Sequence, residues 1–406
     1  MANSKSTKRA KLSHDSSVIE GKEKLEYTYK GKKNEIVPKA ITDIKFASSV
    51  KVIRKAAFEC CHSLTSINIP PSVEVIEERA FCECRSLTTV NIPSSVESIG
   101  EYVFCECTSL KSIKIPSSVK IIERGAFYYC LSLTNIIIPQ SVEEIGNEAL
   151  AECASLKSIK IPTSVKTIGE KAFYESESLE SIKIPPKVKS IDQMTFYGCE
   201  SLASIDIPPA VETIGELAFG HCTSLTNINI PPSITTIEIG TFDRCSQLTS
   251  IDIPQSVTSI EAYAFHGCRS LKSIKIPQSV KHIGQEVFNS CLLLQKVYLS
   301  KICIFQQSSF PSSIKLIYTW YQVGPYILLR ELIKKKRATI RELNEKDKYS
   351  NSSFIQIFLA NVNDDIFRNV LEYLIENEIS KYSSLDSDES YLEDFDDYET
   401  EDSDYS

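Results

Sequence analysis

The chain has 406 residues, 42% of them hydrophobic and 24% charged, with a formal net charge of −8 at pH 7. This composition is typical of a folded chain and excludes a wholly disordered one. No stretch of 18 apolar residues occurs, which argues against a membrane-spanning helix, and residues 1–33 lack the apolar core of a secretory signal. We therefore expect an intracellular protein.

The N-terminal segment, residues 1–34, is predicted to be a flexible basic arm. Residues 1–33 hold nine Lys or Arg against four Asp or Glu, a polar composition that cannot bury a core of its own. Lys8, Arg9 and Lys11 form a short basic cluster that fits a nuclear-import pattern. Basic runs of this length are also common in solvated termini, so both interpretations stay open.

A 23-residue repeat fills residues 35–320. Because no insertion or deletion breaks it over eleven copies, each unit must superpose on its neighbour, as in a solenoid. Leu150 stands where one phenylalanine of the repeat is missing. The other copies carry Phe58, Phe81, Phe104, Phe127, Phe173, Phe196, Phe219, Phe242, Phe265 and Phe288.

One repeat unit contains a strand, a second extended side and a tight turn. Ile113 and Ile115 alternate with Lys114, which predicts a short parallel strand. Pro116 ends this strand because proline has no amide proton to donate. Residues 119–130 then form a second extended side and a packed turn or single helical turn. We expect about twelve such units, with a last strand beginning between Ile317 and Trp320.

The repeat resembles the BspA-like leucine-rich repeat family, whose 23-residue units share these apolar, proline and cysteine positions. The resemblance covers roughly residues 41–300 and implies a right-handed parallel-sheet solenoid used for protein recognition. Bacterial members of that family look like surface adhesins. One unit shows all the matching positions: Leu225, Ile228, Ile230, Pro231, Ile234, Ile237, Phe242 and Cys245.

Cysteine recurs at one repeat position and is expected to form a packed column of reduced thiols. Ser176 replaces it once. The column consists of Cys61, Cys84, Cys107, Cys130, Cys153, Cys199, Cys222, Cys245, Cys268 and Cys291. A zinc site formed by the Cys-x-Cys pairs 82–84 and 105–107 is the alternative, but zinc sites generally use wider Cys-x2-4-Cys spacing. We therefore predict no metal and no cofactor.

No pattern in the sequence indicates catalysis. His62, His221, His266 and His282 occupy different phases of the repeat, so they imply no shared site. The chain also lacks a phosphate-binding loop, a nucleophile elbow and a His-Glu-x-x-His motif. We therefore predict that the protein is not an enzyme.

The outward strand positions are the candidate binding site, because packing fixes their inward neighbours and leaves them free to vary. They include a basic patch centred on Ile137. Solvation of the strand face is the competing interpretation. If the patch binds, we expect an acidic protein segment, including the chain's own C-terminal tail, rather than nucleic acid, because no aromatic residues interleave the lysines. The candidate residues are Lys111, Lys114, Ile137, Lys157, Lys160, Lys183, Asp206, Asp252 and Lys275.

Beyond the repeat, residues 321–381 show helical spacing and are predicted to form either a cap over the sheet end or a separate helical module. Residues 382–406 contain eleven Asp or Glu and no Lys or Arg, which predicts a disordered acidic tail. Acidic residues that follow two of its serines favour phosphorylation, which would add further negative charge.

Together these features favour a non-catalytic protein-binding scaffold in the cytoplasm, with nuclear entry as a further option. The first alternative is a cell-surface adhesin-like protein, by analogy with the bacterial relatives. The second alternative is a nuclear protein that binds basic partners through its acidic tail. The sequence names no partner and does not indicate an oligomeric state.

Overall fold

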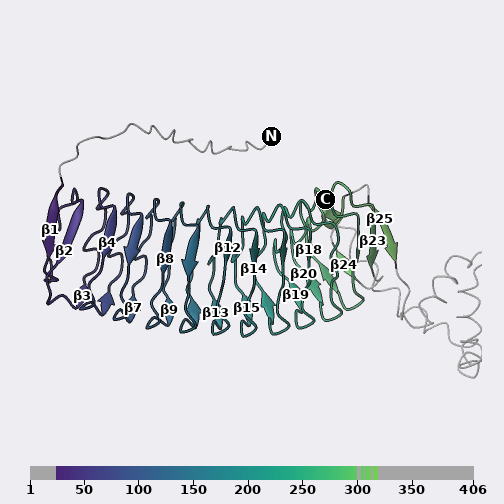
Figure 1. Cartoon of the computed structure of the whole chain (residues 1–406). Helices are drawn as coiled ribbons and strands as arrows, with labels where there is room; N and C mark the ends of the chain where they lie inside the picture. Colours follow the sequence, from purple (N-terminus) through teal and green to yellow (C-terminus); the bar gives the residue numbers. More distant parts are fainter. Residues whose placement is uncertain (1–23, 300–302, 306, 312–313, 319–406) are drawn as a thin grey trace, which may run out of the picture. The chain divides into compact units, whose positions relative to one another are not determined.

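The computed structural model describes residues 24–299, 303–305, 307–311 and 314–318. The chain divides into two compact units, Met1–Thr319 and Trp320–Ser406, and all described residues belong to the first. That unit is a solenoid of parallel strands with about eleven turns, as the repeat predicted (Figure 1). The predicted helical segment 321–381 and the acidic tail 382–406 lie outside the described residues.

The first side of each coil is a short strand that pairs in parallel with the same strand of the next coil. Its middle residue points into the core and its flanking residues point outward, as in β8, where only Ile113 is buried. Asp252 continues this row as an isolated bridge to Asn229. The strands are β2 (Asp43–Phe46), β4 (Ser66–Asn68), β6 (Thr89–Asn91), β8 (Ser112–Lys114), β10 (Asn135–Ile137), β12 (Ser158–Ile159), β14 (Ser181–Ile182), β16 (Ser204–Ile205), β18 (Asn227–Ile228), β21 (Ser273–Lys275), β23 (Lys296–Leu299) and β25 (Lys315–Tyr318).

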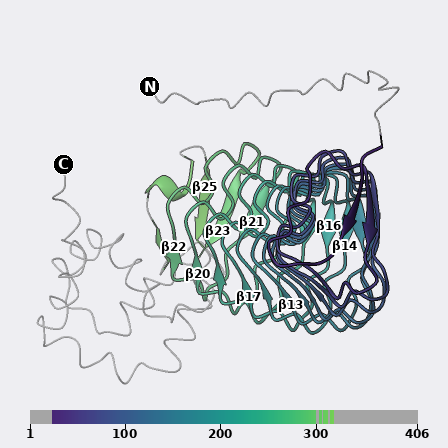
Figure 2. The same ribbon diagram turned by 90° about the vertical axis from the view of Figure 1, so that its left-hand side faces the viewer.

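The second side carries twelve two-residue strands in the described chain, and each ends on an inward residue. These strands also pair in parallel, for example Glu144 with Thr167 and Ile145 with Ile168. Figure 2 looks along the stack and shows the coils superposed. The strands are β3 (Val52–Ile53), β5 (Val75–Ile76), β7 (Ser98–Ile99), β9 (Ile121–Ile122), β11 (Glu144–Ile145), β13 (Thr167–Ile168), β15 (Ser190–Ile191), β17 (Thr213–Ile214), β19 (Thr236–Ile237), β20 (Ser259–Ile260), β22 (His282–Ile283) and β24 (Ile304–Phe305).

The third side is a turn rather than the single helical turn that we considered. Each turn contains two residues with positive φ four positions apart, such as Glu148 (57°) and Glu152 (56°). This left-handed conformation is unfavourable for residues other than glycine. Backbone hydrogen bonds between coils compensate for it, since Glu148 N donates to Glu170 O at 2.8 Å and Glu152 N to Tyr174 O at 2.6 Å. The turns therefore form a third row of coil-to-coil pairing.

A column of stacked phenylalanine rings forms the centre of the core. Rings on successive coils lie 5.2–5.8 Å apart and within 15° of parallel. Leu150 is fully buried at the interruption, between Phe127 and Phe173. Phe310 extends the column beyond Phe288 although the spacing there is 22 residues.

The cysteine column is buried, as predicted, and it also forms hydrogen bonds. Cys107 Sγ donates to the carbonyl oxygen of Phe81 in the previous coil at 3.2 Å. Ser176 Oγ makes the equivalent bond to Leu150 O at 3.0 Å. The position therefore selects a small hydrogen-bond donor, and not only a small side chain. All fourteen cysteines lie in described segments and are free thiols.

Both ends of the solenoid differ from the sequence prediction. Strand β1 (Glu26–Tyr29) pairs in parallel with β2 inside the segment that we expected to be a flexible arm. It is ordered because Tyr29 is fully buried against Phe58. At the other end, β25 begins at Lys315 and pairs with Lys296, so the last coil is 19 residues long. This shortening moves the final strand ahead of the predicted start.

Candidate interaction surface

The predicted binding residues form one exposed row along the first side of the solenoid. We call this row, with Lys111 and Lys157 beside it, the strand face. All nine of its predicted members are exposed. Ile137 is the apolar member, with 51% of its surface accessible. Because β-strand side chains alternate between faces, burying Ile113 and Ile136 forces Lys114 and Ile137 outward.

Parallel register sets the spacing of the row. Lys114 lies opposite Ile137 in the β8–β10 pair, and Lys183 lies opposite Asp206 in an isolated bridge. Lys160 directly follows the paired residue Ile159 and occupies the intervening coil. Neighbouring members of the row are thus separated by about 4.8 Å, the distance between paired strands. The structure brings the basic residues and Ile137 together as the sequence predicted.

Most of these lysines have no ionic partner. Lys157 Nζ lies 3.2 Å from Glu180 on the next coil. Within the described part of the chain, no ion pair involves the remaining basic members of the patch, Lys111, Lys114, Lys160 and Lys183. Their charges stay available to a ligand.

The acidic and C-terminal members continue the same row. Asp206 follows Lys183, Asp252 pairs with Asn229, and Lys275 lies opposite Tyr298 in the β21–β23 pair. The row therefore changes from a basic segment to a mixed segment at Asp206. Any ligand that reads the whole row must be negatively charged toward the N-terminal coils.

The second side handles its charges differently. Lys51, Lys166 and Lys189 each approach a glutamate one coil away, with Nζ–O distances of 2.5, 2.5 and 2.8 Å to Glu74, Glu143 and Glu212. The hydrogen bond from Lys166 lowers the pKa of Glu143 below its ordinary value. Charges on this side are thus largely matched between coils.

The N-terminal end of the first side also contains an open hollow of about 480 Å³. Asn91 Nδ2 donates to Asn68 Oδ1 at 2.8 Å along its wall. The hollow lies beyond the basic patch and is bordered by proline and aromatic carbon. Its lining residues are Ile44, Phe46, Asn68, Ile69, Pro70, Pro71, Asn91 and Pro93.

The turn side brings together histidines that the sequence analysis treated as unrelated. Asp243 Oδ1 lies 2.7 Å from His266 Nδ1, and Asp243 Oδ2 lies 3.7 Å from His221 Nε2. His221 and His266 occupy adjacent positions of the repeat in coils on either side of Asp243, so stacking unites them. Burial lowers the pKa of His221, which opposes its protonation.

The four-cysteine zinc alternative does not form. Cys84 and Cys107 point into the core, where each thiol donates to a phenylalanine carbonyl. Cys82 and Cys105 contact each other on the turn side, and the hydrogen bond between them lowers the pKa of Cys82. The Cys-x-Cys pairs are thus split between two environments. The nuclear-import candidate Lys8, Arg9 and Lys11 lies outside the described residues.

Comparison with protein families identifies the repeat. Residues 37–153, 120–249 and 235–323 match the BspA type leucine rich repeat region. A search of curated proteins gives no match. None of the helices in the described ranges is long and apolar enough to cross a membrane.

Solved bacterial structures resemble the solenoid. A leucine-rich repeat protein from Bacteroides ovatus is 29% identical, with 69% of this chain and 78% of that chain covered and a TM-score of 0.53. A leucine rich cell surface protein from Faecalibacterium prausnitzii is 32% identical, with 64% and 79% covered and a TM-score of 0.48. One from Eubacterium ventriosum is 24% identical, with 70% and 86% covered and a TM-score of 0.53.

The cytoplasmic or nuclear location that we expected is wrong. The chain matches a family whose relatives include a cell surface protein. Our expectation relied on the polar segment 1–33 and on free cysteines. Neither feature determines the compartment, because buried thiols that serve as hydrogen-bond donors do not require a reducing environment to stay apart from one another.

Proposed function

Because the chain belongs to the BspA type leucine-rich repeat family, we propose that it is a non-catalytic solenoid that binds another protein at a cell surface. The observation that carries this proposal is the row of exposed lysines without ionic partners around Ile137. The strand face supplies the binding surface, and the buried columns supply its rigidity.

Rigidity favours binding because the surface needs no ordering when the ligand arrives. The strand-face backbone is already fixed by parallel pairing on both sides, as for β10 between its neighbours. Only side-chain rotamers lose freedom, at a cost of about 0.5–1.5 kcal/mol for each long side chain immobilised. Weak contacts along several coils can therefore add up to useful affinity.

The expected ligand is an acidic segment of a protein with at least one apolar side chain. Carboxylates would approach Lys114, Lys160 and Lys183, while the apolar side chain would cover Ile137. The chain's own acidic segment 382–406 has this charge and is a second possible occupant. Nucleic acid is less suited, because the strand face has no aromatic platform among these lysines.

A labelled oligo-glutamate peptide titrated into the full chain tests the surface. The double variant Lys114→Glu, Lys160→Glu should weaken binding by about tenfold or more, since each change turns attraction into repulsion. Its matched control is Lys166→Glu, Lys189→Glu on the second side, which alters the net charge equally. Equal losses in both double variants would show that only net charge matters and would remove the strand face from the proposal.

Exposure at the cell surface needs its own experiment. Intact cells that express the chain are treated with a membrane-impermeant biotin reagent, and the captured fraction is compared with that of a cytoplasmic marker. We expect the chain to be labelled and the marker to be spared. Labelling of the chain only after lysis would overturn the surface role without affecting the binding test.

A further inference from the structure

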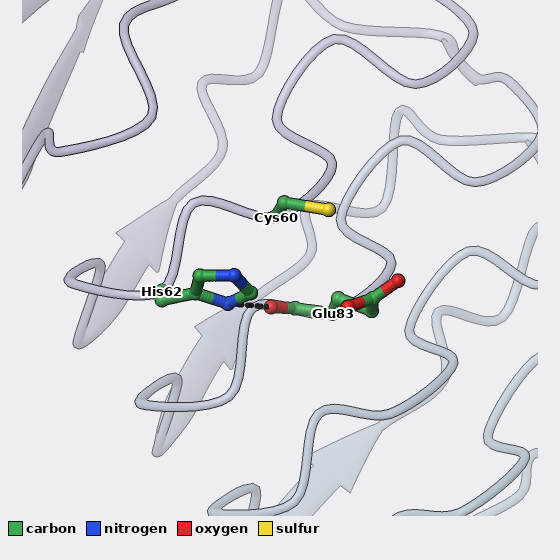
Figure 3. Close-up of side chains that lie close together, drawn as sticks. All are labelled: Cys60, His62 and Glu83. Carbon is green, nitrogen blue, oxygen red and sulfur yellow. Dashed lines mark hydrogen bonds between the residues drawn. The ribbon is translucent and has the colours of Figure 1, made fainter.

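Three side chains of different chemistry converge at the N-terminal end of the turn side. Cys60 and His62 belong to the first coil, and Glu83 belongs to the next one. One ligand atom from each lies within 4.8 Å of the other two (Figure 3). No other three His, Cys, Asp or Glu side chains in the described ranges come as close.

The imidazole is oriented by the backbone of the neighbouring coil. His62 Nδ1 lies 2.9 Å from the carbonyl oxygen of Glu83, which can only accept a hydrogen bond. This contact therefore places the proton on Nδ1 and leaves the lone pair of Nε2 available. Metal-binding histidines are generally held in this way by a carbonyl or carboxylate on the other nitrogen.

The set of donors selects the metal. A thiolate, an imidazole and a carboxylate are zinc ligands, whereas calcium and magnesium prefer oxygen alone. Ligands around a tetrahedral zinc lie about 3.5 Å apart, given bond lengths of about 2.0–2.3 Å. Cys60 is half-buried and Glu83 is half-buried, so their side chains need only small rotations to reach that spacing.

The combination is specific to this coil. The repeat positions of Cys60 and His62 are held by Glu83 and Arg85 in the next coil. Arg85 Nη2 contacts Glu83 Oε2 at 2.9 Å and Glu106 Oε2 at 3.0 Å. Glu83 thus already binds one cation through one carboxylate oxygen, and Arg85 has a second acidic partner to retain if a metal competes for Glu83.

We propose that Cys60, His62 Nε2 and Glu83 bind one zinc ion, with a fourth position open to water. The ion connects the first two repeat coils. Terminal coils of a solenoid have a neighbour on one side only and are the least supported. Zinc binding therefore stabilises the N-terminal end of the array by mass action.

Cobalt(II) is the probe, because a cobalt–thiolate bond gives a near-ultraviolet charge-transfer band. We expect the full chain to develop this band in a saturable way with one equivalent of cobalt, and zinc to abolish it. Cys60→Ser should eliminate the band. His62→Ala and Glu83→Gln should weaken cobalt binding by at least about tenfold. Saturation at one equivalent with an unchanged band in Cys60→Ser would overturn the assignment, as would the absence of saturable binding.

Two further variants keep the test sharp. Arg85→Ala removes a positive charge next to the carboxylate and should tighten cobalt binding by about two- to fivefold. Cys82→Ser removes the nearest thiol outside the set and should leave both band and affinity unchanged. Weaker binding in Arg85→Ala, or loss of the band in Cys82→Ser, would contradict the proposed ligands.

Amide hydrogen exchange provides a readout independent of colour. Zinc should slow exchange in residues 54–84 of the full chain and leave residues 200–290 unaffected, because the ion connects only the first coils. The same zinc concentration should have no effect on Cys60→Ser. Equal slowing along the whole array, or in the variant, would contradict a local site.

Discussion

The first and second sides of the solenoid share one register but use their lysines in opposite ways. On the second side, Lys166 and Lys189 pair with glutamates on adjacent coils. On the strand face, Lys114 and Lys160 follow the same coil-to-coil spacing and pair with nothing in the described part of the chain. Identical backbone geometry therefore supports either matched or unmatched charge.

The difference teaches where the repeat constrains the sequence and where it does not. Packing fixes inward positions such as Ile113 and Ile145, both of which are buried. The outward residues are free of that constraint, so charge matching on one side and its absence on the other are independent of the fold. Unmatched lysines cost little in water and become useful when a ligand supplies the opposite charge.

The largest effect should come from a change that removes both sides together. Phe196→Ala leaves a cavity between Phe173 and Phe219, whose rings stack on Phe196 at 5.5 and 5.6 Å. We expect a loss of about 3–5 kcal/mol in unfolding free energy, measured by urea denaturation. Phe196→Leu is the control and should cost less, since Leu150 fills the same position naturally. A loss below 1 kcal/mol for the alanine variant would contradict the stacked core.

Alkaline pH should destabilise both sides through the thiols beneath them. Burial raises the pKa of Cys153 and Cys291 to about 12, from an ordinary value of 9.0. The native state keeps these protons while the unfolded state loses them, so their contribution is complete below pH 9 and disappears between pH 9 and pH 12. Each such thiol should cost about 1.4 kcal/mol per pH unit in that window.

Denaturation midpoints measured from pH 7 to pH 11 check this expectation. Cys153→Ser should lower the steepness of the alkaline decline, because serine does not titrate there and Ser176 already replaces cysteine in the column. A midpoint that stays constant up to pH 11 would be inconsistent with buried protonated thiols.

The smallest effect should come from the charge pairs of the second side. Lys166→Ala removes the hydrogen bond that lowers the pKa of Glu143, so this pKa should return toward its ordinary value. Because the folded pKa is depressed, the pair's contribution is present above the unfolded pKa and is lost as pH falls through the folded pKa. Side-chain NMR titration of Glu143 measures the shift, and an unchanged pKa would contradict the pairing.

Much of the fold follows from the sequence, because a constant repeat length brings equivalent residues together. The buried phenylalanine and cysteine columns and the exposure of Lys114 and Ile137 were predicted in this way. The left-handed turns were not, since positions such as Glu148 and Glu152 hold no glycine to announce them. The final strand was misplaced because the last coil shortens to 19 residues.

Contacts between different repeat positions were also missed. Cys60, His62 and Glu83 approach one another only because the turns of adjacent coils stack, and no linear motif contains all three. The same applies to His266 and Asp243, which lie 23 residues apart. Comparison of each coil with its successor, position by position and with neighbouring positions included, is the pattern that could have found them.

Lysine footprinting most directly tests whether the strand face is the binding surface. The full chain is acetylated under limiting reagent, with and without saturating oligo-glutamate peptide, and modification of each lysine is quantified by mass spectrometry. We predict protection of Lys114, Lys160 and Lys183 by the peptide and unchanged modification of Lys166 and Lys189. Equal protection on both sides, or protection confined to Lys166 and Lys189, would contradict the assignment of the strand face.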